Sequence, residues 1–189
     1  MKKVLIITGI IIGAIILIRA FLVLLAVTGA FSIFTPNPPK PEIKYGEFPF
    51  RLEYELNGEL KVIEDTIICE FDGFESLGTA GKYRVWKTYL KSGNERIILL
   101  DFRSVDEINE LGRKMIALYF FYGSGEYYMD DEYDFRKRAG NDISKVSYIY
   151  QYSAEEIRYA SYTAEEAFER YGIKLISWEP SEPIVNSYK

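Results

Sequence analysis

The chain begins with a long apolar segment, and the rest of it shows apolar and polar residues in alternating or helical patterns. Residues 4–34 are apolar except for small hydroxyl residues and Arg19, and Lys2 and Lys3 precede them. A helix needs about 20 apolar residues to cross a bilayer, so this segment is long enough for one pass. Basic residues mark the cytoplasmic flank of such a helix. We therefore expect residues 1–34 to be an uncleaved signal anchor in the cell membrane, with the N-terminus cytoplasmic and the C-terminal domain outside.

Two features of this segment leave alternatives open. Thr28-Gly29-Ala30 is an acceptable cleavage site for a secretory signal peptide. The apolar core of a signal peptide runs about 7 to 15 residues, however, and this run is about twice as long, so we favour the anchor. Arg19 either pairs with an acidic partner in the membrane or extends its guanidinium to the headgroups, and we favour the second because the outer interface is within reach.

Small residues share one face of the expected membrane helix. Gly9 and Gly13 form a GxxxG pair, and at about 100° per residue Ala20 falls between them. Small side chains let two helix backbones approach closely. This face predicts a homodimer through the membrane helix, although GxxxG pairs also arise by chance.

A proline-rich segment follows the apolar one. Residues 35–46 hold four of the seven prolines and no apolar period. Such sequence is typical of extended polyproline II, which predicts a semi-rigid stalk. A ligand for a proline-recognising module is the weaker alternative.

Alternation of apolar and polar residues then predicts a series of strands. The first covers 48–57 and is followed by Asn57-Gly58, a dipeptide typical of a type I′ hairpin. The return strand is expected over 59–71, with a bend or bulge near Glu64-Asp65. The segment 96–102 is apolar on both faces, which predicts a central strand. The other expected strands are 83–90, 114–122, 145–152 and 173–178.

One helix is clearly indicated near the C-terminus. Thr163 and Glu166 form a capping box before the apolar stripe of 164–171, and Gly172 supplies the stop. For residues 153–162 a short helix and a strand-like connection remain equally open. A loop is expected over 72–82, one or two helical turns over 104–113, and an acidic loop over 126–142.

These elements predict an α+β fold. We expect a mainly antiparallel β-sheet or a small barrel with one C-terminal helix, behind a single N-terminal transmembrane helix. The expected organisation is the anchor, the stalk, an extracytoplasmic domain over residues 47–180, and a tail over 181–189.

Charge narrows the classes of partner. Lys2, Lys3 and Arg19 are the only charges in residues 1–34, which leaves 20 basic and 28 acidic residues, a net charge of about −8, in the rest. An acidic domain argues against binding to nucleic acid and to anionic lipid, both of which need a basic surface.

Cysteine and histidine usage narrows the chemistry. The chain has one cysteine, Cys69, and no histidine, which excludes a disulfide within the chain, most zinc sites and Ser-His or Cys-His catalysis. Cys69 lies in an apolar strand, so we expect a buried core cysteine rather than a nucleophile. An outside domain without disulfides is typical of a Gram-positive bacterial surface. We expect no cofactor.

An acidic loop is the candidate for a metal site. Calcium prefers oxygen ligands such as the carboxylates and the amide of this loop. The spacing of these residues is not that of an EF-hand, however, and the basic run 136–138 lies within the loop. We therefore expect a solvated loop with local ion pairs and no metal site. The residues concerned are Asp130, Asp131, Glu132, Asp134, Asn141 and Asp142.

Tyr148, Tyr150 and Tyr152 share one face of an expected strand. An exposed tyrosine row binds sugars or protein partners well, which makes these residues a candidate binding surface. Packing of this face on the core or under the helix is the favoured interpretation.

Several stretches resemble a group of small membrane-anchored proteins of Gram-positive bacteria to which no activity is assigned. The resemblance covers most of residues 46–183 and implies a domain outside the cell behind one N-terminal helix, but no site residues. It is carried by GEFPFRLEYELNGE, EDTIICEFDGF, GKYRVWKTYLKSGNE, EYYMDD and TAEEAFERYGIKLISWEP.

The sequence therefore favours a non-enzymatic module that binds a protein or a cell-wall partner. The alternative is a carboxylate-dependent cell-envelope hydrolase, which needs an acid and a base or nucleophile. With 28 acidic residues the sequence cannot choose such a pair.

Overall fold

The computed structural model describes residues 2–27, 35–76, 81–131, 137–140 and 142–189. The chain forms two units. The first consists of residues 1–40 and 72–85, and the second consists of residues 41–71 and 86–189.

The first unit contains the apolar helix and residues 35–40 of the proline-rich segment, whereas residues 41–46 belong to the second unit. Helix α1 covers Lys2–Val27. Taken over the residues whose side chains the structure describes, no helix is long and apolar enough to cross a membrane. The proline-rich segment is held in this unit by Arg84, a buried residue whose guanidinium donates to the Pro39 carbonyl at 3.0 Å. The Tyr83 hydroxyl donates to Glu75 at 2.6 Å in the same unit.

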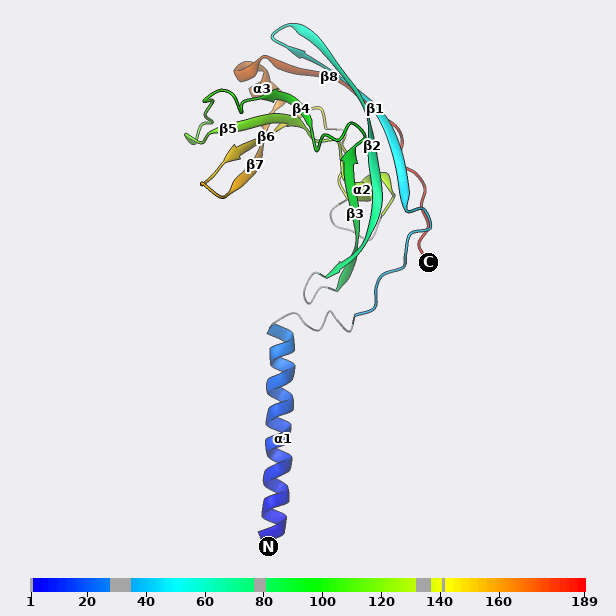
Figure 1. The fold of residues 1–189 in the computed structure, drawn as a ribbon, viewed down its shortest axis with the longest axis vertical. Coiled ribbons are helices and arrows are strands. Elements are labelled where there is room, and N and C mark those ends of the chain that lie inside the picture. The colour runs from blue at the N-terminus through cyan, green and yellow to red at the C-terminus, as the bar shows by residue number, and fades with distance from the viewer. Residues whose placement is uncertain (1, 28–34, 77–80, 132–136, 141) are drawn as a thin grey trace. The chain divides into compact units, whose positions relative to one another are not determined.

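Two four-stranded sheets account for most of the fold (Figure 1). The first has the order β3-β2-β1-β8 and the second the order β4-β5-β6-β7. With the short helices α2 (Gly125–Tyr128) and α3 (Ala164–Tyr171), this is a mainly antiparallel α+β fold, as expected. The strands of the first sheet are β1 (Tyr45–Leu56), β2 (Glu59–Ser76), β3 (Lys82–Leu90) and β8 (Ile173–Pro180). Those of the second are β4 (Ile97–Asp101), β5 (Met115–Phe120), β6 (Lys145–Gln151) and β7 (Ile157–Thr163).

The β1–β2 hairpin turns where the sequence predicted. Asn57 and Gly58 have φ values of 53° and 83°, as a type I′ turn requires. The prediction of a bulge near Glu64-Asp65 is wrong, because the β1–β2 register is unbroken from Tyr45 to Leu56. The irregularity lies instead between β1 and β8, at Glu53/Tyr54.

The second sheet corrects one expectation and settles another. Strand β4 is an edge strand and not a central one. Its inner residues Ile97 and Leu99 are buried, whereas Ile98 on the other face is 38% exposed. Residues 157–163 form strand β7, which pairs antiparallel with β6, so the strand-like alternative for 153–162 is the correct one. Residues 104–113 form turns without a helix.

Helix α3 is capped as predicted. The Thr163 hydroxyl accepts from the Glu166 backbone N–H at 3.2 Å, and the Glu166 carboxylate accepts from the Thr163 N–H at 2.8 Å. Gly172 ends the helix in the left-handed conformation, with φ of 64°.

Aromatic rings fill the core between the two sheets. Trp178 of β8 lies 4.8 Å from Phe120 of β5 and 4.9 Å from Phe50 of β1, measured between ring centroids. Tyr128 of α2 lies 4.8 Å from Phe48 of β1. Because these rings join both sheets, the second unit has one continuous core.

The C-terminal residues after β8 are bound to the domain. The Ser181 N–H donates to Pro49 at 2.8 Å, and the Ile184 N–H donates to Tyr128 at 3.0 Å. The Tyr188 hydroxyl donates to the Met129 carbonyl at 2.8 Å. The expected tail, 181–189, therefore lies along the domain surface.

Candidate functional site

The tyrosines that the sequence singled out do not form a free surface. Tyr148 and Tyr150 are each only 8% exposed, and Tyr148 stacks on Tyr162 with ring centroids 4.3 Å apart. Their side chains point inwards because β6 lies between β5 and β7 and its inner face joins the core. Tyr152, beyond the end of β6, is half-buried under the Arg158 guanidinium, 3.3 Å from its ring centroid.

The small residues of α1 lie on its exposed surface. Gly9, Gly13 and Ala20 are all exposed, and a Cβ added at either glycine would meet no atom within 4 Å. Arg19 is exposed as well. A helix dimer through this face stays a prediction.

Cys69 is a core residue, as predicted. It is fully buried, and this burial raises the pKa of its thiol from 9.0 to about 12. A thiol with so high a pKa is protonated at neutral pH, so it is neither a nucleophile nor a metal ligand there.

The acidic loop is less solvated than expected. Asp131 is fully buried, and its carboxylate accepts a hydrogen bond from the Trp86 indole at 2.9 Å. Asp130 forms an ion pair with Lys137 at 3.1 Å. Glu132, Asp134 and Asn141 lie outside the described residues. Within the described part of the chain, no cluster of acidic, cysteine or histidine residues is able to hold a metal ion.

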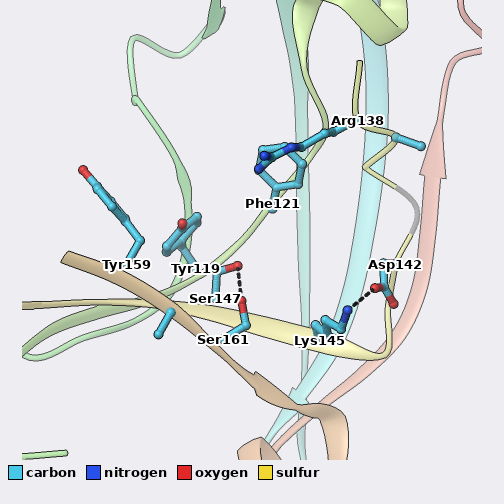
Figure 2. A pocket seen from close by; sticks show the side chains of 10 residues that line it. Tyr119, Phe121, Arg138, Asp142, Lys145, Ser147, Tyr159 and Ser161 are labelled. Atoms are coloured by element: carbon cyan, nitrogen blue, oxygen red, sulfur yellow. Dashed lines mark hydrogen bonds and ion pairs between the residues drawn. The ribbon is translucent and has the colours of Figure 1, made fainter. Parts of the chain in front are cut away.

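An open groove lies on the outer face of the second sheet (Figure 2). It has a volume of about 560 Å³. Its floor and walls come from β5, β6 and β7 and from the segment before β6. Its lining residues are Tyr119, Phe121, Arg138, Ala139, Asp142, Lys145, Ser147, Tyr159, Ala160 and Ser161.

Strand register brings three hydroxyl groups together across the floor of this groove. Tyr119 of β5 pairs with Ser147 of β6, which pairs with Ser161 of β7. The two serine hydroxyl oxygens are 3.3 Å apart. Burial raises the pKa of the Tyr119 phenol, and the neighbouring Ser147 hydroxyl opposes part of this shift. The floor is therefore a row of neutral groups that can each donate and accept hydrogen bonds.

Aromatic rings form the walls. Phe121 is 41% exposed and Tyr159 is 51% exposed. Arg96, which precedes β4, fixes the tyrosine rings, because its guanidinium carbon lies 5.7 Å from the Tyr119 centroid and 5.5 Å from the Tyr159 centroid. Its Nη2 also donates to the Tyr159 hydroxyl at 3.2 Å. Arg96 thus holds the Tyr159 ring in place, and Phe121 adds a second exposed aromatic surface to the walls.

Three charged side chains line the groove: Lys145 and Asp142 lie together at one end, and Arg138 lies beside Phe121 (Figure 2). The Lys145 ammonium is 3.4 Å from the Asp142 carboxylate. The pKa of Asp142 is lowered, first by the hydrogen bond that the Ser144 hydroxyl donates to it and then by Lys145. Arg138 also lines the groove, and its guanidinium forms no ion pair with a carboxylate of the described chain.

Sequence reasoning missed this groove for a definite reason. The strand pattern of 145–152 does place Ser147 opposite the tyrosine row. The sequence did not predict that Ser161 lies beside Ser147, because it left residues 153–162 undecided between a helix and a strand. Tyr119 lies beside the two serines only because β5 pairs with β6 in a particular register, which the sequence does not specify.

Comparison with known proteins yields no match, whether with family models, with curated proteins or with solved structures. The resemblance to membrane-anchored proteins of Gram-positive bacteria therefore stays an expectation, and function must be argued from the groove itself.

Proposed function

We propose that the chain is a membrane-anchored, extracytoplasmic binding module and that the groove on the second sheet is its binding site. The observation that carries this proposal is the combination, in one hollow, of exposed aromatic walls, a hydroxyl floor and the Arg138 guanidinium, which pairs with no carboxylate of the described residues. Binding sites are concave, largely apolar, and contain a few polar groups that fix orientation. The partner is a cell-wall polymer or an envelope protein.

The groove favours binding over hydrolysis. Glycoside hydrolysis needs two carboxyl groups, one of them a general acid with a raised pKa. Among the described residues, the groove is lined by one carboxylate, Asp142, and the Ser144 hydroxyl and Lys145 lower its pKa. A carboxylate of this kind stays ionised and cannot donate a proton near neutral pH.

A binding assay with the full chain in detergent micelles tests the site. We expect the protein to co-sediment with bacterial cell envelopes, and the double variant Phe121→Ser/Tyr159→Ser to bind about tenfold more weakly, equivalent to about 1.4 kcal/mol. The matched control is Leu60→Ser/Val62→Ser, which removes two exposed apolar side chains of β2.

The same assay identifies the class of partner. Retention on envelopes stripped of protein indicates a wall polymer, and loss of retention on stripping indicates an envelope protein. Equal retention of the groove variant and the β2 variant on every preparation would exclude the groove as the site.

The anchoring part of the proposal rests on the sequence of residues 4–34, on their basic flank, and on the helical conformation of α1. Protease added to intact cells should remove a C-terminal tag and spare an N-terminal one. Protection of the C-terminal tag would contradict an outside location, and release of the domain into the medium would indicate cleavage.

A further inference from the structure

We propose that the groove recognises a carbohydrate that carries an acidic group. This inference rests on the proposed function and names the ligand class of the same site. Three properties of the groove support it: the chemistry of the floor, the placement of the rings and the sign of the charge.

The floor suits a polyol. The hydroxyls of Ser147 and Ser161 are 3.3 Å apart, and Tyr119 is in register with them on the next strand. Each of these groups both donates and accepts, as sugar hydroxyls do. A sugar can therefore exchange hydrogen bonds with the floor in either direction, whereas an apolar side chain would leave the floor hydroxyls unsatisfied.

The walls suit the apolar faces of sugar rings. Phe121 and Tyr159 stand above the polar floor as exposed rings, so aromatic surface lies beside the hydroxyl row. Protein–protein interfaces have the opposite arrangement, with an apolar core and a polar rim. Strands β5 and β6 also have neighbours on both edges, so a peptide strand could pair with the sheet only along the outer edge of β4 or β7 and not across the floor.

The charge of the groove points to an acidic ligand. Residues 35–189 carry a net charge of about −8. The described residues that line the groove nevertheless include two cationic side chains, Arg138 and Lys145, and one carboxylate, Asp142. Lys145 is paired with that carboxylate, whereas Arg138 has no such partner in the described chain. A guanidinium binds a carboxylate or a phosphate through two parallel hydrogen bonds, so Arg138 is the group that would bind the acid.

The test uses the full chain in detergent micelles and calorimetric titration with defined sugars. The acidic probe is the disaccharide of N-acetylglucosamine and N-acetylmuramic acid, and its methyl ester is the neutral probe of the same shape. N-acetylglucosamine 6-phosphate tests whether the acid is a phosphate. We expect one acidic probe to bind at least about tenfold more tightly than the ester.

Variants assign the preference to the groove. Arg138→Gln should remove the preference for the acid and leave the affinity for the ester unchanged. Ser161→Val should weaken both. Lys137→Gln is the matched control, because its ammonium is already paired with Asp130 at 3.1 Å and does not line the groove, so the preference should persist.

Four outcomes would overturn the inference. Equal affinity for the acid and the ester would show that the groove does not recognise an acidic group. A preference for the acid that survives Arg138→Gln would show that Arg138 does not bind that group. If no sugar binds while Phe121→Ser/Tyr159→Ser still lowers retention on envelopes, the ligand class is wrong but the binding module stands. If neither assay responds to groove variants, both proposals fail.

Discussion

The Trp86 indole nitrogen donates a hydrogen bond to the Asp131 carboxylate at 2.9 Å, and both side chains are buried. Trp86 belongs to β3, and Asp131 follows α2. A buried carboxylate is costly unless hydrogen bonds compensate for its lost hydration. This bond therefore ties the segment after α2 to the first sheet.

Trp86→Phe should destabilise the protein because it removes this donor from a buried charge. Hydrogen bonds to charged groups contribute about 1.5–3 kcal/mol. We expect a loss of that order in the free energy of unfolding, in addition to the packing cost, measured by urea denaturation.

Trp178→Phe is the matched control for this change. The Trp178 indole nitrogen is also buried but has no hydrogen-bond partner in the described structure. The same substitution there removes packing only, so its cost should be smaller. Equal costs at the two sites would show that the bond to Asp131 contributes little.

The acidic loop shows why sequence alone misplaced Asp131. A run of charged residues followed by basic ones is typical of a solvated loop, and Asp130 with Lys137 behaves in that way. Nothing local distinguishes Asp131 from its neighbour. Its buried position brings it to Trp86, which is distant in the sequence and reaches it only through the fold.

Features encoded locally were predicted well. The Asn57-Gly58 turn and the capping box of Thr163 and Glu166 depend on residues within a few positions, and the structure contains both. Features set by register were not predicted. The edge position of β4 and the alignment of Ser147 with Ser161 depend on which strands pair, which an apolar pattern does not specify.

Cys69 should be unreactive in the folded protein. Because it is fully buried and its pKa is raised to about 12, a thiol reagent at pH 8 should label it only after unfolding, as mass spectrometry would show. Rapid labelling of the folded chain would contradict its burial.

The same thiol predicts a pH dependence of stability. The pKa of this thiol is 9.0 when it is solvated, as in the unfolded chain, and about 12 in the folded protein. Between these two pH values the folded protein therefore binds one more proton than the unfolded chain. The contribution of this thiol to the free energy of unfolding should therefore be constant below pH 9 and fall as pH rises towards 12, by at most about 1.4 kcal/mol per pH unit. Cys69→Val should reduce the slope in that window, and an unchanged slope would assign the alkaline loss to tyrosines alone.

Helix α1 carries a prediction about self-association in the membrane. Gly9 and Gly13 are exposed, with open space around them, so a second helix could approach there. In a membrane two-hybrid assay on residues 1–34, Gly13→Ile should abolish the signal because its side chain blocks close contact. Leu22→Ile is the control and should keep the signal, and equal signals from both variants would exclude this contact face.

The end of α3 supplies the sharpest stability test. Gly172 has φ of 64°, and its carbonyl accepts a hydrogen bond from the Asn57 N–H at 2.9 Å, which docks the helix end on the β1–β2 turn. Gly172→Ala should destabilise for two reasons. A non-glycine residue in the left-handed region costs about 1–2 kcal/mol, and the added Cβ would collide with the Asn57 carboxamide oxygen.

Gly112 separates these two costs. Its φ of 67° is nearly the same, but a Cβ there would meet no atom within 4 Å. Gly112→Ala therefore measures the backbone cost alone, and in urea denaturation Gly172→Ala should lose more free energy of unfolding than Gly112→Ala. The double variant Gly172→Ala/Asn57→Gly should recover part of the difference, because it removes the colliding carboxamide and keeps a residue that tolerates positive φ. Equal losses for the two alanine variants would show that the helix end is not packed against the turn.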